Sequence, residues 1–152
     1  IPMGGVVCTK EIYDAFMTGP ENMIELFHGY TYSGHPVAAA AGLATLDCYK
    51  EDSLFERAAD IAPYWEEAVH SLKGLPHVID IRNLGLIGAI ELEPAPGKPT
   101  ARAYEALVKC FEKGLLIRTT GDIIALSPPL IVEKQHIDEM FGLLSDVLKD
   151  IA

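Results

Sequence analysis

The hydrophobic pattern of the chain changes near residue 75, and this change limits the folds that the chain can adopt. Before it, apolar residues recur at helical spacing, for example at Leu54, Ile61 and Trp65. After it, residues 78–82 and 88–93 alternate apolar and polar side chains, as half-buried antiparallel strands do. The sequence therefore predicts helical material followed by a compact unit of about four strands and two helices, an open-faced α+β sandwich.

Two helices are predicted in the first fifty residues. One spans residues 9–17 with Thr9 as its cap, and the other spans residues 37–50, directly after Pro36. Proline is well suited to the first turn of a helix because its missing N–H has no partner there. Residues 38–42 all have small side chains, which predicts that the second helix is deeply packed against another backbone.

Local signals also predict the elements that follow. A capping box at residues 53–56 begins a third helix, and Thr100 caps a fourth helix that runs to about Lys113. Two short strands are expected at residues 115–118 and 123–126. A last helix is indicated by apolar residues at alternating four- and three-residue steps: Ile137, Phe141, Leu144, Leu148 and Ile151.

The composition excludes several classes of protein. Of the 152 residues, 49% are hydrophobic, which is ordinary for a globular protein and excludes intrinsic disorder. Twelve basic and 22 acidic residues give a net charge of -10, so neither a nucleic acid nor an anionic membrane surface is expected as a partner. No apolar run reaches the ~18 residues that span a bilayer. A small anionic substrate remains compatible with this charge.

Cysteines and histidines give no sign of a disulfide scaffold or a metal centre. Cys8, Cys48 and Cys110 are few, odd in number and far apart, which favours a reducing compartment, the cytoplasm. They are interpreted as small buried apolar groups. His28 and His35 have no cysteine or carboxylate nearby at ligand spacing, so no metal site is expected.

The loop at residues 28–36 is the densest functional signal. Gly29 keeps its backbone open, Thr31 supplies a hydroxyl, and a helix begins just beyond it. These are the parts of an oxyanion or phosphate site. The alternative is that Thr31 is only a cap at the entry of the helix.

Five segments, in order along nearly the whole chain, carry a family resemblance. They are Pro-Met-Gly-Gly-Val at residues 2–6, His-Gly-Tyr-Thr-Tyr-Ser-Gly-His-Pro-Val-Ala at 28–38, Val-Ile-Asp-Ile-Arg-Asn-Leu-Gly-Leu at 78–86, Gly-Leu-Leu-Ile-Arg at 114–118 and Gly-Asp at 121–122. They resemble the class III (omega) aminotransferases, which are pyridoxal 5'-phosphate enzymes of the α/β fold type I. The resemblance is greatest to the omega-amino acid–pyruvate branch, which includes β-alanine–pyruvate aminotransferase.

The resemblance implies a domain organisation. Residues 1–50 would be the end of the large cofactor-binding domain, residues 51–75 a linking helix, and residues 76–152 the C-terminal small α+β domain. The apolar start of the chain, residues 1–7, also reads as the interior of a longer protein.

The resemblance also implies roles for three residues. Thr31, with the backbone of Tyr30 nearby, would bind the cofactor phosphate of the other subunit across a dimer interface. Arg118 would hold the substrate carboxylate through two parallel hydrogen bonds. The alternative for Arg118 is a surface salt bridge. The family's Schiff-base lysine lies shortly before the Pro-Met-Gly turn, so the chain is expected to contain no catalytic residue and to be inactive alone.

The implied reaction moves an amino group from an omega-amino acid or amine, such as β-alanine, to pyruvate through pyridoxal phosphate, in a homodimer or higher homo-oligomer. Two alternatives remain open at this stage. The chain could belong to another class III enzyme, of the ornithine or γ-aminobutyrate type or a semialdehyde aminomutase. It could also be a non-catalytic dimerisation or ligand-binding domain.

Overall fold

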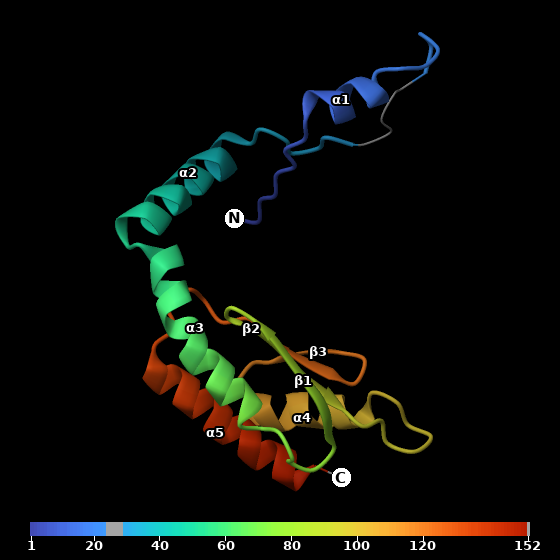
Figure 1. The fold of residues 1–152 in the computed structure, drawn as a ribbon. Coiled ribbons are helices and arrows are strands. Elements are labelled where there is room, and N and C mark those ends of the chain that lie inside the picture. Colours follow the sequence, from blue (N-terminus) through green and yellow to red (C-terminus); the bar gives the residue numbers. More distant parts are fainter. Residues whose placement is uncertain (24–28, 152) are drawn as a thin grey trace. The chain divides into compact units, whose positions relative to one another are not determined.

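The computed structural model describes residues 1–23 and 29–151, and it divides into two compact units (Figure 1). We call Ile1–Glu51 the N-terminal unit and Asp52–Ala152 the C-terminal unit, and each is described by itself. The boundary thus falls well before residue 75, because the helix predicted as a link contributes buried side chains to the core of the C-terminal unit. His28, the first residue of the predicted loop motif, lies outside the described residues.

The N-terminal unit contains helices α1 (Lys10–Phe16) and α2 (Pro36–Glu51), close to their predicted bounds. Thr9 caps α1 as predicted, since its side chain accepts a hydrogen bond from the Ile12 N–H at 3.5 Å.

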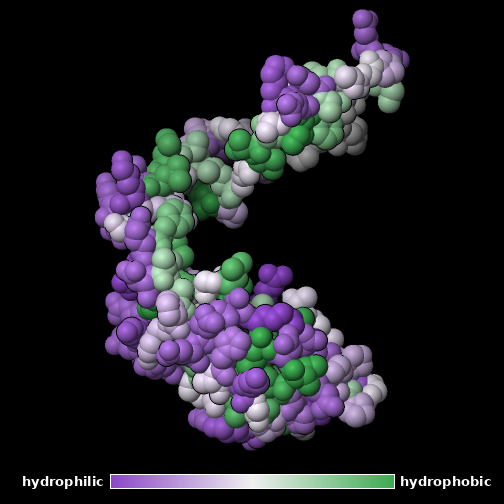
Figure 2. Space-filling view, in the orientation of Figure 1, coloured by the Kyte–Doolittle hydropathy of each residue, from purple (hydrophilic) through white to green (hydrophobic). Residues whose placement is uncertain are grey.

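The deep packing predicted for α2 is wrong for this chain. None of its residues is buried, and the apolar side chains of Val37, Leu43 and Leu46 are exposed. Figure 2 shows hydrophobic residues at the surface of α2. The described part of the N-terminal unit contains two helices and loops and no strand, so it offers α2 no sheet face on which to pack.

The C-terminal unit is an open-faced α+β sandwich, as predicted. Its four strands form an antiparallel sheet in the order β1-β2-β4-β3. Along the chain its elements are α3 (Leu54–His70), β1 (Val78–Leu84), β2 (Ile87–Leu92), α4 (Ala101–Glu112), β3 (Arg118–Thr120), β4 (Ile123–Leu126) and α5 (Lys134–Asp150). The register places Ile90 opposite Ile124, and both pack in one core cluster with residues of all three helices. The other face of the sheet is therefore left open.

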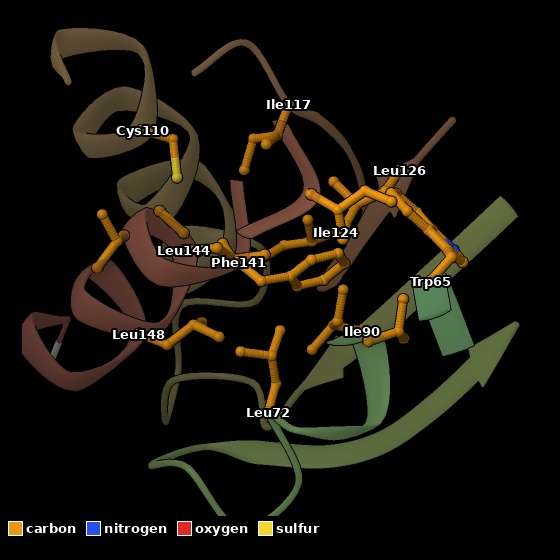
Figure 3. Packing of buried hydrophobic residues seen from close by; sticks show 14 of the residues in the cluster. Trp65, Leu72, Ile90, Cys110, Ile117, Ile124, Leu126, Phe141, Leu144 and Leu148 are labelled. Carbon is orange, nitrogen blue, oxygen red and sulfur yellow. The ribbon is translucent and has the colours of Figure 1, made fainter. Parts of the chain in front are cut away.

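Trp65 belongs to this core cluster, and its side chain packs on one side of it (Figure 3). Its ring is fully buried and meets the Phe141 ring edge-on, with the two centroids 5.2 Å apart. Gly88 lets β2 approach α3, because a Cβ there would lie 3.1 Å from Val69 Cγ2. Gly85 has a φ of +54° in the turn between β1 and β2. Gly85 thus serves a turn and Gly88 a close contact between a strand and a helix.

Two predicted caps are wrong. Ser53 and Thr100 have φ values of 49° and 71°, and neither side chain caps its helix. A capping side chain needs an extended backbone at that position, which these two residues do not have. A capping box occurs instead at the start of α5, where the Glu133 N–H donates to His136 Nδ1 at 3.2 Å.

Strand β3 is shorter than predicted. Leu115 follows α4 and is held to its end, because its N–H donates to the Cys110 carbonyl at 2.8 Å. Pairing with β4 therefore begins only at Arg118.

The prediction that all three cysteines are buried holds for Cys110 alone, since Cys8 and Cys48 are exposed. Within the described residues, no helix has both the length and the apolar character needed to cross a membrane.

Candidate functional site

The loop before α2 consists of two consecutive turns. The Ser33 N–H donates to the Tyr30 carbonyl at 2.9 Å, and the His35 N–H donates to the Tyr32 carbonyl at 3.2 Å. Tyr32 has a φ of +69° and Gly34 a φ of +68°, so both lie in the left-handed region. These turns present the exposed side chains of Tyr30 and Thr31 at the start of the loop.

The position of Thr31 argues against its alternative role as a helix cap. Helix α2 begins at Pro36, so the capping position belongs to His35, four residues after Thr31. The His35 carbonyl indeed accepts the hydrogen bond from the Ala39 N–H at 2.9 Å. The Thr31 hydroxyl is therefore not needed to begin α2.

The charge around this loop suits an anion. The chain has a net charge of -10, yet no aspartate or glutamate occurs between Leu26 and Leu46. The first turn of α2 contains no acidic residue, and a helix N-terminus attracts negative charge. A hydroxyl and backbone N–H groups bind a phosphate without a basic side chain. The residues of this loop therefore fit a phosphate group.

Arg118 lies on the open face of the sheet in the C-terminal unit. It is the first residue of β3, which is an edge strand, and it pairs with Ala125 of β4. The next residue, Thr119, pairs with the buried Ile124. Since side chains alternate along a strand, Arg118 must point away from the core, and its side chain is exposed.

Arg118 differs from the other three arginines in its charge partners. Arg57 lies 4.0 Å from a Glu133 oxygen, and Arg102 lies 3.8 Å from a Glu93 oxygen. Arg82 hydrogen-bonds both Glu91 and Asp80, and these bonds raise the pKa of its guanidinium. Within the described residues, Arg118 forms no ion pair. The alternative that Arg118 forms a surface salt bridge therefore has no carboxylate partner among the described residues.

Small side chains lie beside Arg118 on the open face. The register aligns Arg82, Ala89, Ala125 and Arg118 in one row across the four strands. The two alanines between the arginines leave the surface next to Arg118 low and apolar.

The sequence matches a known family over nearly its whole length. The profile of class III aminotransferases matches residues 1–148. The chain belongs to this family. Class III aminotransferases depend on pyridoxal 5'-phosphate, so the resemblance stated from the five sequence segments is confirmed. The alternative of a non-catalytic dimerisation or ligand-binding domain is not favoured.

Relatives in this family support the same assignment. An omega-aminotransferase of Caulobacter vibrioides is 60% identical over 99% of this chain and 34% of its own length. A beta-alanine--pyruvate aminotransferase of Pseudomonas aeruginosa is 44% identical over 100% of this chain and 34% of its own length. The chain thus spans about a third of the length of these class III relatives.

Solved structures confirm the α/β fold class of the family. An adenosylmethionine-8-amino-7-oxononanoate aminotransferase from Methanocaldococcus jannaschii superposes with a TM-score of 0.76 and 30% identity, over 94% of this chain and 34% of that one. A thermostable omega transaminase variant from Pseudomonas jessenii gives a TM-score of 0.74 and 33% identity, over 82% of this chain and 29% of that one.

Sequence reasoning missed two polar clusters of this class III chain. Arg82 with Asp80 and Glu91 could have been found from strand alternation, because all three fall on one face of a predicted β1–β2 hairpin. The contacts of Asp122, described below, join residues from three separate elements, and no local pattern announces them.

Proposed function

We propose that this chain is part of a pyridoxal phosphate-dependent aminotransferase that moves an amino group from an omega-amino acid or amine, such as β-alanine, to pyruvate. The class III assignment and the 44–60% identity to an omega-aminotransferase and a beta-alanine--pyruvate aminotransferase support the reaction. The observation that carries the substrate class is the exposed guanidinium of Arg118, which has no carboxylate partner within the described residues.

In this proposal Arg118 binds the carboxylate of the amino donor and of the keto acid. Its planar guanidinium donates two parallel hydrogen bonds to a carboxylate, which fixes the orientation of the substrate as well as its position. Arg82, in the same row of the sheet, is already bonded to Asp80 and Glu91. One available arginine on this face therefore favours substrates with one carboxylate, as β-alanine and pyruvate have.

Thr31 and Tyr30 are proposed to hold the phosphate of the cofactor. The Thr31 hydroxyl donates to a phosphate oxygen, and the backbone at Tyr30 and Thr31 lines the same position. When bound, pyridoxal phosphate supplies the electron sink for amino transfer, while the protein binds and orients the reactants. The fit rests on the exposed hydroxyl and on the absence of acidic residues from Leu26 to Leu46.

The wider organisation is also part of the proposal. We assign residues 1–50 to the end of the large cofactor-binding domain, residues 51–75 to a linking helix and residues 76–152 to the small domain. We further propose a homodimer or higher homo-oligomer in which Thr31 serves the neighbouring subunit's cofactor. The three free cysteines support a reducing compartment, the cytoplasm.

The substrate role of Arg118 is tested by replacing it with alanine in the complete enzyme. With pyruvate as acceptor, we expect Arg118→Ala to raise the KM for β-alanine by about 10- to 100-fold, because a charge-assisted carboxylate contact is lost. The KM for 1-phenylethylamine, a donor without a carboxylate, should change less than about twofold.

Lys98→Ala is the matched control, since Lys98 is an exposed cation of the same unit that is outside the proposed site. It should leave both KM values unchanged. Equal effects of Arg118→Ala on the two donors would contradict the assignment of Arg118 as the carboxylate-binding residue.

A further inference from the structure

The position of Arg118 depends on a very short strand. Strand β3 has three residues, lies at the edge of the sheet, and is joined to β4 by the two-residue turn Gly121–Asp122. Gly121 has a φ of +60°, as the first residue of a tight hairpin turn requires. A strand with so few ladder bonds relies on its turn to fix where its first residue lies.

Asp122 attaches this turn to two other elements. Its Oδ1 accepts a hydrogen bond from the Thr100 N–H at 2.8 Å, directly before α4. Its carbonyl accepts a hydrogen bond from the Leu92 N–H at 2.8 Å, at the end of β2. The hairpin that bears Arg118 is thus fastened both to the sheet and to the start of a helix.

The same contact occupies the carboxylate that lies nearest to Arg118 along the sequence. Asp122 is the acidic residue closest to Arg118 in the sequence. Within the described residues the two form no ion pair, and the half-buried Asp122 carboxylate bonds the Thr100 N–H. A carboxylate at the N-terminus of α4 is also favoured by the helix dipole. Both effects hold the Asp122 carboxylate at the start of α4.

We propose that Asp122 is a positioning residue for Arg118: by bonding the Thr100 N–H, it fixes the β3–β4 hairpin and leaves the guanidinium available to the substrate. The inference rests on the proposed function of Arg118. In this inference Asp122 supports the carboxylate site without touching the substrate or the cofactor. Loss of the Asp122 side chain weakens carboxylate binding, because the hairpin that bears Arg118 is then no longer held to the start of α4.

The test compares Asp122→Ala, Asp122→Ser and Asp122→Asn in the complete enzyme, with the two donors used for Arg118→Ala. The alanine and serine side chains do not reach the Thr100 N–H, so each should raise the KM for β-alanine by about fivefold or more, with little change for 1-phenylethylamine. Asparagine keeps an acceptor oxygen, so Asp122→Asn should recover most of the lost affinity. If Asp122→Ala disrupts folding, Asp122→Ser provides the same test, because serine is favoured in turns.

Tyr64→Phe is the matched control for general loosening of the unit. It removes the Tyr64–Asp138 hydrogen bond between α3 and α5, which does not involve the hairpin, and it should affect both donors equally or not at all. A rise in KM that is equal for the two donors in the Asp122 variants would overturn the proposal.

Hydrogen exchange separates this inference from the proposed function. In Asp122→Ala, the amides of residues 118–126 should exchange faster than in the wild-type enzyme, whatever the substrate. Unchanged exchange there would refute the positioning role even if Arg118 binds carboxylates. If Arg118→Ala affects both donors equally while exchange is faster in Asp122→Ala, the proposed role of Arg118 fails and with it the substrate-directed part of the inference.

Discussion

The two units differ in the burial of their apolar side chains. In the C-terminal unit, Trp65, Ile90 and Leu148 are fully buried, with no exposed surface. In the N-terminal unit, none of the described residues is buried, and Val6 and Val7 are 97% and 99% exposed. Both stretches have patterns that predict helices with an apolar face, and only one of them supplies a sheet on which such faces can pack.

The difference shows what an amphipathic pattern can establish. The pattern predicts that the apolar face of a helix packs against another element, and it does not identify that element. In the C-terminal unit the cover is the sheet of the same unit. In the N-terminal unit the exposed apolar residues match the proposal that this stretch is completed by the rest of a larger enzyme. The candidate phosphate loop lies in the N-terminal unit, whose apolar residues are exposed. Arg118 lies in the C-terminal unit, which has its own core.

The largest expected effect comes from separating the two units. Residues 52–152, expressed alone, should fold and unfold cooperatively in urea, because their core is complete within the unit. Residues 1–51 alone should give no cooperative transition, since stretches of about this size without a core are marginal. Circular dichroism during urea titration measures both. A cooperative transition for residues 1–51 would break the comparison.

Single substitutions should show the same contrast. Trp65→Ala leaves a large cavity in the core and should lower the free energy of unfolding of the C-terminal unit by about 3–5 kcal/mol. Leu43→Ala, at a side chain that is 65% exposed in α2, should change this free energy of unfolding by less than about 0.5 kcal/mol. Chemical denaturation of the chain checks both values. Similar losses for the two variants would contradict the assignment of the core.

Cysteine labelling distinguishes the units chemically. Burial raises the pKa of the Cys110 thiol to about 11, so at pH 8 it is both inaccessible and protonated. Cys8 and Cys48 are exposed. In the native chain at pH 8, iodoacetamide should label the two N-terminal cysteines and spare Cys110, and urea should make all three reactive. Mass spectrometry of labelled peptides gives the answer, and rapid native labelling of Cys110 would disprove its burial.

The smallest effect concerns the end of α5. Lys109 hydrogen-bonds Asp150, which lowers the pKa of the Asp150 carboxyl below its ordinary 3.8. A depressed pKa stabilises the fold above the unfolded value, and this stabilisation is lost as pH falls through the folded value. Asp150→Asn should therefore lower the melting temperature at pH 7 and by less as the pH approaches 3. The effect is slight because the Asp150 side chain is largely exposed.

Asp14→Asn is the control for this pH experiment. It removes an ion pair within the single helix α1 and should leave the melting of the C-terminal unit unchanged at both pH values. An effect of Asp150→Asn that grows as the pH falls would contradict the assigned direction of the pKa shift.

Local signals predicted most of the fold. Helix faces such as Ile61, Trp65 and Val69 and the alternation in β1 and β2 follow from side-chain period alone, and the structure confirms them. Caps were less predictable, because Ser53 and Thr100 adopt left-handed backbones that no local pattern indicates. A capping motif indicates which side chain is able to cap a helix. Whether it does so depends on the backbone conformation at that residue.

The residues of the candidate site follow from the sequence and the family resemblance, and their roles stay predictions; the contacts that support them could not be predicted. Thr31 and Arg118 were found from motifs. That Arg118 faces away from the core depends on the register of β3 with β4, and that Asp122 bonds Thr100 depends on two segments 22 residues apart. Such contacts arise only when the elements assemble, so no local pattern in the sequence reveals them.

The central claim is that the Thr31 hydroxyl binds the cofactor phosphate, and the affinity of the complete enzyme for pyridoxal phosphate tests it most directly. Thr31→Val keeps the shape of the side chain and removes the hydroxyl, so it should raise the dissociation constant about 10-fold. Thr31→Ser should stay close to wild type, as should Ser33→Ala, whose hydroxyl belongs to the same loop. An unchanged dissociation constant for Thr31→Val would contradict the account.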